Sequence, residues 1–148
     1  MPFKAVFYTN PAYWKMHLWR QDDDGNTILH WIASFQQNAR WMNELIQRYP
    51  GDLPLNYRGR SPLYSAADSG NAPTVQVLLE HVDSSETSSA LPDAIGNGNE
   101  TITRMLLRHG AYVDSRDSTD RSPLYAAIES GVAGVVKALL RVRRRRLR

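Results

Sequence analysis

The chain offers few residues that could catalyse a reaction or hold a metal ion. Its 148 residues include no cysteine, which excludes thiolate nucleophiles, iron–sulfur ligands and cysteine-based zinc sites. The four histidines, His17, His30, His81 and His109, are dispersed along the sequence. The motifs H-E-x-x-H, G-x-S-x-G and G-x-G-x-x-G are absent, as is the P-loop motif. These observations argue against an enzyme.

Two polar runs have the residue types of a ligand site without its spacing. The triplet at residues 22–24 is D-D-D, but it lacks the ligand spacing and closing glutamate of an EF-hand loop. Residues 96–100 read G-N-G-N-E and fall at an expected turn between helices, with no strand before them as a dinucleotide-binding loop requires. We therefore expect no catalytic residue, no cofactor and no bound metal.

Basic residues are concentrated at the C-terminus. The net charge is +3, yet six of the eighteen basic side chains lie in the last eight positions, and the rest of the chain is acidic. They are Arg141, Arg143, Arg144, Arg145, Arg146 and Arg148. A run of cations can cap the last helix, or it can serve as a nuclear signal or a polyanion contact. Contact with nucleic acid or an anionic membrane is expected only through this tail.

Aromatic residues are concentrated at the other end. Residues 1–20 hold six of the fourteen aromatics: Phe3, Phe7, Tyr8, Tyr13, Trp14 and Trp19. We interpret this segment as a cap over the first repeat of the array described below, because terminal repeats need an atypical outer face. The alternative is an aromatic anchor for a binding partner.

An internal sequence repeat predicts the structural units that position the histidines, the polar runs and the two terminal segments. Residues 60–70 recur as residues 121–131, with eight of eleven identical, and weaker copies begin near residues 25 and 89. The leucines at the same place in the four copies are Leu29, Leu63, Leu91 and Leu124, at steps of 34, 28 and 33 residues. The chain is therefore built on a repeat of about 33 residues, with one unit shortened.

Each repeat has the pattern of two short helices joined by a turn. Ser61 precedes a proline, as an N-cap residue does, and Gly70 provides the turn that ends the first helix. Apolar residues at intervals of three and four form one stripe on each helix, so neighbouring units must stack to bury them. The shared core is predicted to contain Leu63, Ala66, Leu78, Leu79, Leu91, Leu106, Leu124 and Leu139.

The repeat resembles the ankyrin repeat, whose signature is T-P-L-H-x-A. Residues 27–33 read T-I-L-H-W-I-A, and residues 61–66 and 122–127 keep the proline, leucine and alanine with tyrosine in place of histidine. Residues 110–113 read G-A-Y-V and residues 22–25 read D-D-D-G, similar to the linker and the finger turn of that family. The resemblance implies an all-α solenoid of stacked helix-turn-helix units with β-turn fingers. It also implies that His30 hydrogen-bonds the finger loops.

This resemblance divides the chain into three parts. Residues 1–20 form the N-terminal capping segment, residues 21–140 the repeat domain, and residues 141–148 the basic tail. The repeats span about 22–55, 56–83, 84–116 and 117–140. Five residues are missing from the third finger, so we expect a short polar loop at residues 83–89 that interrupts the concave surface. In the fourth finger Asp120 takes the place of glycine. This substitution is tolerable because aspartate is among the residues that adopt the left-handed conformation.

The resemblance implies a protein-binding module, with the partner bound by the finger tips and the inner face of the first helices. On this sequence those positions are Asp23, Asp24, Asn26, Tyr57, Arg58, Arg60, Asp68, Ser69, Ser118, Thr119, Arg121, Glu129 and Ser130. Tyr57, Arg58 and Arg60 are the favoured anchors, since tyrosine and arginine are enriched at binding hot spots. Each of these residues could instead be an ordinary solvated loop residue.

The expected partner is another protein, bound by a monomeric scaffold or adaptor. One alternative is an inhibitor of a transcription factor similar to the IκB group, which only the repeats support. The other alternative is polyanion binding by the arginine tail. The N-terminus does not read as a secretory signal, so we expect an intracellular protein of the cytoplasm, the nucleus or both.

Overall fold

The computed structural model describes residues 12, 16–117 and 119–147. Most of the predicted N-terminal cap, including Phe3, Phe7, Tyr8, Tyr13 and Trp14, lies outside the described residues, as do Ser118 and Arg148. Trp19 is within them and is partly exposed, next to Leu18, which is buried.

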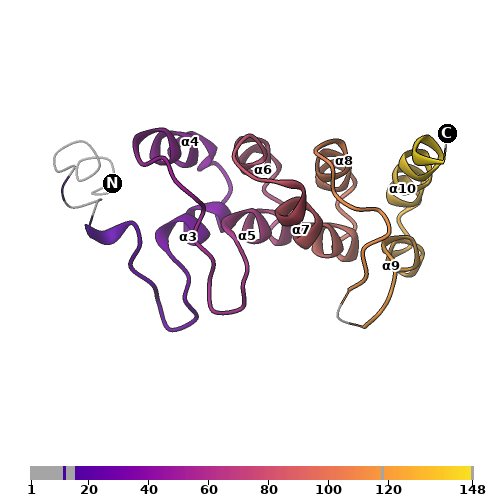
Figure 1. Ribbon diagram of the computed structural model, residues 1–148, viewed down its shortest axis with the longest axis horizontal. Helices are drawn as coiled ribbons and strands as arrows, with labels where there is room; N and C mark the ends of the chain where they lie inside the picture. Colours follow the sequence, from indigo (N-terminus) through magenta and orange to yellow (C-terminus); the bar gives the residue numbers. More distant parts are fainter. Residues whose placement is uncertain (1–11, 13–15, 118, 148) are drawn as a thin grey trace.

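The described chain folds into four helix pairs that stack in one direction, which confirms the all-α repeat fold (Figure 1). The first helices of the pairs, α3, α5, α7 and α9, form an inner row, and the second helices α4, α6, α8 and α10 form an outer row. The pairs are α3 (Ile28–Ser34) with α4 (Ala39–Arg48), α5 (Pro62–Asp68) with α6 (Ala72–Leu79), α7 (Ser84–Gly96) with α8 (Glu100–Arg108), and α9 (Pro123–Ser130) with α10 (Ala133–Arg146).

Buried apolar side chains between the two rows hold the stack together. Seven of the eight predicted core residues are buried, and Leu124 is half-buried. Leu124 belongs to α9, which packs against an inner helix on one side only. The turns between paired helices use the left-handed conformation at Gly70 and Gly131, with φ of +71° and +73°. Asp120 also adopts it, with φ of +60°, as predicted.

Three fingers extend from the inner row: the first spans residues 20–27, the second 49–61 and the fourth 109–122 (Figure 1). Each has the same polar turn, in which one side-chain oxygen accepts the backbone N–H groups of the residues two and four positions later. That oxygen belongs to Asp22, Asn56 and Asp117, with N–O distances of 2.8–3.0 Å. The three fingers therefore share the same pattern of side-chain to backbone hydrogen bonds.

The third repeat has no finger, and the polar loop predicted at residues 83–89 is wrong. Residues 84–89 are instead the first turns of α7. The Asp83 carboxylate caps this helix by accepting N–H groups of Ser85 and Glu86 at 2.8 and 3.0 Å. The acidic Glu86 in the first turn also favours the positive end of the helix dipole. The shortened segment therefore lengthens a helix rather than forming a loop.

The last outer helix continues into the arginine run. Helix α10 extends through Arg146, so residues 141–146 are its last turns and are mostly exposed. No helix in the described part of the chain is both long enough and apolar enough to cross a membrane.

Candidate protein-binding groove

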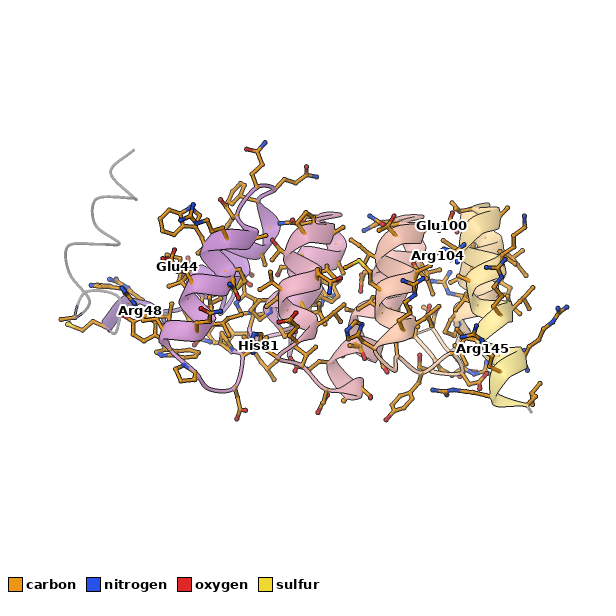
Figure 2. The ribbon with its side chains drawn as sticks, turned by 90° about the horizontal axis from the view of Figure 1, so that it is seen from above. Glu44, Arg48, His81, Glu100, Arg104 and Arg145 are labelled. Atoms are coloured by element: carbon orange, nitrogen blue, oxygen red, sulfur yellow. The ribbon has the colours of Figure 1, made fainter. Side chains whose placement is uncertain are left out.

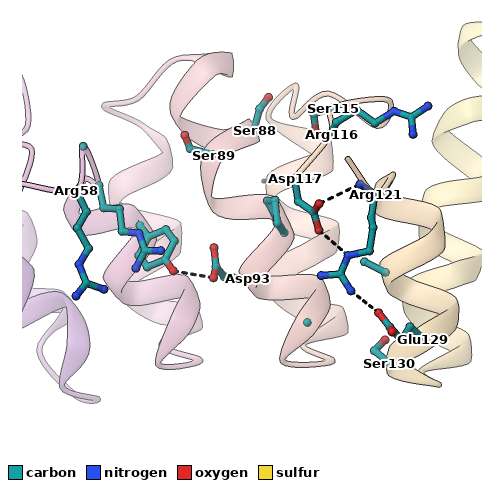
Figure 3. Close-up of a pocket in the computed structure, with 16 residues that line it drawn as sticks. Arg58, Ser88, Ser89, Asp93, Ser115, Arg116, Asp117, Arg121, Glu129 and Ser130 are labelled. Atoms are coloured by element: carbon teal, nitrogen blue, oxygen red, sulfur yellow. Dashed lines mark hydrogen bonds and ion pairs between the residues drawn. The ribbon is translucent and has the colours of Figure 1, made fainter. Parts of the chain in front are cut away.

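A groove of about 710 Å³ lies on the inner face where the third finger is missing (Figure 3). We call it the concave groove. The second finger and α5 form one wall, α7 forms the floor, and the fourth finger and α9 form the other wall. Its lining residues are Arg58, Gly59, Arg60, Tyr64, Ser88, Ser89, Pro92, Asp93, Gly96, Ser115, Arg116, Asp117, Arg121, Ala126, Glu129 and Ser130.

The floor is formed by polar residues of α7. The hydroxyl of Ser88 donates to the carbonyl of Ser84, and that of Ser89 donates to the carbonyl of Ser85. Pro92 follows in the same helix and has no N–H for the Ser88 carbonyl, the group that it would normally bond. The Ser88 hydroxyl also accepts the backbone N–H of Tyr112 at 2.9 Å. This bond ties the floor of the groove to the start of the fourth finger.

One wall is a hydrogen-bonded set that joins the second and third repeats. The Tyr64 hydroxyl donates to the Asp93 carboxylate at 2.7 Å, and the Arg60 guanidinium lies 4.0 Å from the Tyr64 ring centroid. Burial raises the pKa of the Asp93 carboxyl, while the hydrogen bond from Tyr64 and the charge of Arg60 oppose that rise. Burial, assisted by the bond to Asp93, raises the pKa of Tyr64 to about 12. Tyr64 is therefore the proton donor of this pair at neutral pH.

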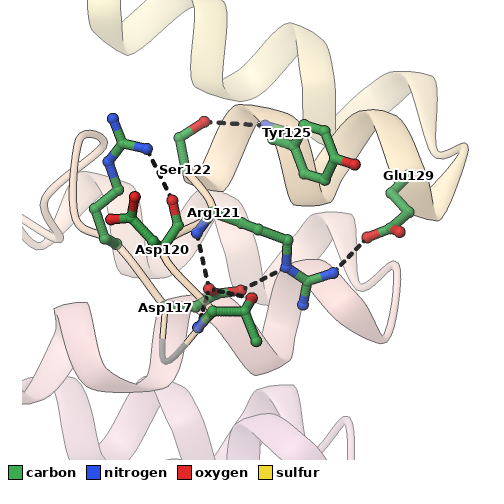
Figure 4. Close-up of polar contacts among 8 residues, drawn as sticks. Asp117, Asp120, Arg121, Ser122, Tyr125 and Glu129 are labelled. Atoms are coloured by element: carbon green, nitrogen blue, oxygen red, sulfur yellow. Dashed lines mark hydrogen bonds and ion pairs between the residues drawn. The ribbon is translucent and has the colours of Figure 1, made fainter.

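The other wall is held by the ion pairs of Arg121. Its guanidinium lies 3.0 Å from the Asp117 carboxylate and 2.6 Å from that of Glu129, which joins the fourth finger to α9 (Figure 4). Asp117 also accepts the hydroxyl of Thr119 at 2.7 Å. The bonds from Thr119, followed by those from Arg121, hold the pKa of Asp117 far below its usual range. This wall is charged and remains open to solvent.

The concave groove has four arginines and three carboxylates. Each carboxylate has a partner in the groove, because Tyr64 bonds Asp93 and Arg121 bonds the other two. Arg58 and Arg116 are exposed, with Arg116 donating to the backbone carbonyl of Asp120 at 2.8 Å. The groove therefore presents a modest excess of positive charge on a polar floor. Within the described residues, no group of three or more histidine, aspartate or glutamate side chains could hold a metal ion.

Comparison with known proteins identifies the family of the repeat. The family description "Ankyrin repeats (3 copies)" matches residues 13–88, about half of the chain. The chain belongs to the ankyrin-repeat family. Ankyrin repeats are modules of protein–protein interaction and are generally scaffolds rather than enzymes. The match begins within the segment that we interpreted as a cap. Residues 121–131 of the fourth repeat lie outside the match, but they repeat the sequence of residues 60–70, which lie within it.

Curated relatives match most of this chain but are longer proteins. The chain is 30% identical over 124 residues to the transient receptor potential cation channel subfamily A member 1 homolog of Caenorhabditis elegans, covering 81% of this chain and 10% of that protein. It is 28% identical to the B-cell lymphoma 3 protein homolog of Mus musculus, covering 81% and 29%. It is 25% identical to the probable 26S proteasome regulatory subunit p28 of Saccharomyces cerevisiae, covering 82% and 58%. The chain thus spans less than two thirds of each of these relatives.

The ankyrin histidine has the structural role that the resemblance implied. The Nδ1 atom of His30 accepts the backbone N–H of Thr27 at 3.1 Å, so the ring proton is on Nε2. Nε2 then donates to the backbone carbonyl of Arg60 in the second finger at 2.9 Å. Burial lowers the pKa of His30, which keeps the ring neutral. His30 therefore joins the first two ankyrin repeats.

The structure brings only some of the predicted partner-binding residues together. Arg58, Arg60, Arg121, Glu129 and Ser130 line the concave groove. Asp23 and Asn26 line a separate hollow beside Trp31 in the first repeat, and Asp24 lies at the tip of the first finger. Tyr57 is 70% exposed and packs against Gly25, with its backbone N–H donating to the Asp24 carbonyl at 3.1 Å.

The remaining predicted residues lie at the ends of elements. Asp68 ends α5 and accepts the Asn97 side-chain amide through its backbone carbonyl at 2.9 Å. The Ser69 hydroxyl donates to the carbonyl of Ser65 at 2.7 Å. Thr119 is exposed in the fourth finger, and Ser118 next to it is outside the described residues.

Sequence reasoning missed Tyr64, Asp93 and Arg116 in the concave groove. A signal for Tyr64 was present, because it takes the place of His30 in the ankyrin motif and therefore should contact the next repeat. Asp93 has no such signal, since its role depends on the missing third finger.

Proposed function

We propose that this ankyrin-repeat chain is a non-enzymatic scaffold or adaptor that binds a segment of a partner protein in the concave groove. The observation that supports this site is the gap left by the third finger. In the first two repeats the fingers lie side by side and bond each other, as in the contact of Tyr57 with Asp24. Between the second and fourth fingers no finger fills the space, and the floor is helix α7.

The charges in the groove favour a partner segment with acidic side chains. Arg58 and Arg116 are exposed, on opposite walls of the groove, and arginine forms two parallel hydrogen bonds to a carboxylate. A partner carboxylate that reached Arg121 would compete with Asp117 and Glu129, so we assign the exposed arginines the main role. Arg60 lies against the Tyr64 ring beside them.

Predicted residues outside the groove would extend the same interface. The first finger, with Asp23, Asp24 and Asn26, and the exposed ring of Tyr57 lie on the N-terminal side of the groove. Asp68 and Ser69 follow on α5, and Ser118 and Thr119 belong to the fourth finger. A partner longer than the groove would contact them next.

Affinity capture followed by measured binding tests this function. The full chain is used to capture a partner, and the dissociation constant of the purified pair is then compared for the wild type and for Arg58→Ala combined with Arg116→Ala. We expect this variant to bind at least tenfold more weakly with an unchanged melting temperature, because hot-spot arginines contribute about 2 kcal/mol or more to binding. Gln76→Ala, on the outer helix α6, is the matched surface control. Equal affinities for all three proteins would place the interface elsewhere.

The arginine tail supports a second function. Arg141 and Arg143 to Arg146 are exposed on the last turns of α10, where they could serve as a nuclear signal or contact a polyanion. Deleting residues 143–148 of a tagged protein should leave folding almost intact and shift the protein from nucleus to cytoplasm. An unchanged distribution together with a lower melting temperature would make the tail a helix cap alone.

Inhibition of a transcription factor in the manner of the IκB group stays a prediction, as do the monomeric state and the intracellular location of the protein.

A further inference from the structure

A second groove lies on the outer row of helices, between α8 and α10, far from the concave groove. It has a volume of about 340 Å³ and four arginines along its sides, two from each helix. We call it the basic groove. Figure 2 shows Arg104 on α8 and Arg145 on α10, which stand side by side as the last two outer helices. The other two arginines are Arg108 and Arg141.

The spacing along each helix places two arginines of each helix beside this groove. Arg104 and Arg108 are four residues apart on α8, and Arg141 and Arg145 are four residues apart on α10. Residues at this interval lie on the same helix face, and like charges there repel each other. Arg143 and Arg146 belong to the same basic run but do not line the groove. The basic groove is thus lined by two arginines of the tail and by two arginines of the preceding repeat.

Within the described residues, one carboxylate pairs with this set. Arg104 lies 2.6 Å from the Glu100 carboxylate. Glu100 also sits against the α10 backbone at Gly134, since a Cβ added to that glycine would collide with the Glu100 carboxylate. Glu100 is thus held near the start of α10, whereas Arg141 and Arg145 lie toward its end. One carboxylate for four arginines leaves an excess of three positive charges.

The floor of the basic groove indicates which ligand the groove suits. It consists of Leu107, Ala138 and Val142. Leu107 is 7% exposed, Ala138 is 4% exposed and Val142 is half-buried, so the apolar floor is a narrow strip that offers little area to an amphipathic helix of a partner protein. A bound molecule would therefore be flanked by arginines on both sides of this narrow strip, and the planar N–H pairs of their guanidinium groups match phosphate oxygens. The volume is in the range of sites for small molecules.

We propose that the basic groove is a binding site for a compact ligand with several phosphate groups. The ligand bridges α8 and α10 and neutralises Arg108, Arg141 and Arg145, with Arg104 shared between the ligand and Glu100. This site is independent of the proposed protein-binding function, because its residues and those of the concave groove do not overlap. It rests on the polyanion contact proposed for the tail and narrows it to Arg141 and Arg145, joined by two arginines of α8.

Calorimetric titration of the full chain with inositol hexakisphosphate at physiological salt is the direct test. We expect saturable binding to one site. Arg108→Gln combined with Arg145→Gln should weaken it at least tenfold, because two charge-assisted contacts are lost. The matched control is Arg143→Gln combined with Arg146→Gln, which removes the same charge from the same region and should change the affinity by less than about threefold. Glu100→Gln should strengthen binding, because Arg104 is released from its partner.

Several results would overturn the proposal. If both double variants weaken binding equally, or if single-stranded DNA binds more tightly with the same loss in both, the arginines attract polyanions by charge alone. Absence of binding by a wild-type chain with an intact melting transition would leave these arginines as helix caps only.

Vesicles distinguish the two sources of such a ligand. Flotation with vesicles containing phosphatidylinositol 4,5-bisphosphate is compared with phosphatidylserine vesicles of equal charge. Binding to the first vesicles alone, lost in the Arg108→Gln and Arg145→Gln variant and competed by inositol hexakisphosphate, assigns the site to a lipid headgroup. Tight binding of inositol hexakisphosphate without vesicle binding assigns it to a free polyphosphate. Either result supports the proposal.

Discussion

The Tyr64 hydroxyl lies 2.7 Å from an Asp93 carboxylate oxygen, and this contact joins the second and third repeats. Between the first and second repeats the corresponding position is His30, whose ring contacts the Arg60 carbonyl in the next finger. The third repeat has no finger to supply such a carbonyl. A longer side chain at this position instead reaches a carboxylate on the next inner helix, which keeps the stack intact across the gap and forms a wall of the concave groove.

Replacing Tyr64 by phenylalanine should destabilise the chain. The Asp93 carboxylate would lose its donor while remaining half-buried, at a cost of about 1–3 kcal/mol in the free energy of unfolding. Urea denaturation measures the loss. Tyr125→Phe is the matched control, because Tyr125 has the same place in the fourth repeat but is exposed, and it should change stability by less than about 0.5 kcal/mol. Equal losses in the two variants would show that the contact with Asp93 contributes nothing.

Acidification should weaken the fold through His30. Its pKa lies below the ordinary value of 6.5 because of burial, so protonation favours the unfolded chain. The contribution of the neutral ring is complete above pH 6.5 and is lost as the pH falls from 6.5 toward the lowered folded-state pKa. The raised pKa values of Glu86 and Asp93 act in the opposite direction, in the carboxyl range. Melting temperatures measured from about pH 7 to pH 5 should fall in the wild type.

Two histidine variants test whether His30 causes the fall in melting temperature on acidification. His30→Gln should have a lower melting temperature at neutral pH and a smaller change between pH 7 and pH 5. His81→Gln, at an exposed position, should retain the wild-type pH dependence. A wild-type slope that persists in His30→Gln would assign the titration to another group.

Gly25→Ala should be destabilising for two separate reasons. Gly25 has φ of +80°, and a Cβ there would lie 2.6 Å from the backbone nitrogen of Tyr57, which cannot move without losing its bond to Asp24. We expect a loss of about 2–4 kcal/mol in the free energy of unfolding. Gly59→Ala isolates the backbone cost, since Gly59 has φ of +70° with open space around its Cβ, and should lose about 1 kcal/mol. If Gly59→Ala is as damaging as Gly25→Ala, the contact between the first two fingers is not the cause.

Leu106→Ala tests whether stacking of the repeats stabilises the chain. Leu106 is a fully buried core residue of α8, and its truncation leaves a cavity that costs about 2–5 kcal/mol. In an array of four repeats this loss can abolish the cooperative thermal transition that circular dichroism records. The exposed Gln76→Ala variant should melt as the wild type does. Coincident melts of the two variants would contradict the stacking.

Most of the fold could be predicted from the sequence because each repeat carries the same local signals. The proline at the start of α5 and α9, the glycine turns at Gly70 and Gly131, and the left-handed Asp120 are all where the repeat pattern predicted them. These features depend on residues close in sequence. Repetition also made each of them visible more than once.

The concave groove could be predicted only in part, because it depends on contacts between repeats. The serines at residues 84, 85, 88 and 89 are poor helix formers, so the sequence favoured a loop, whereas the Asp83 cap and the packing of α7 make them helical. Tyr64 and Asp93 are 29 residues apart and meet only in the stacked array. The same is true of the basic groove, where arginines of α8 join those of α10.

The central claim is that a partner protein binds in the concave groove, and site-specific photocrosslinking tests it most directly. A photoreactive residue is placed at Ser89 on the groove floor or at Gln76 on the outer helix, and both proteins are irradiated in an extract of the source cells. We predict a specific adduct from the Ser89 position, identified by mass spectrometry, that disappears when Arg58 and Arg116 are replaced by alanine. A specific adduct from the Gln76 position with none from Ser89 would contradict the account.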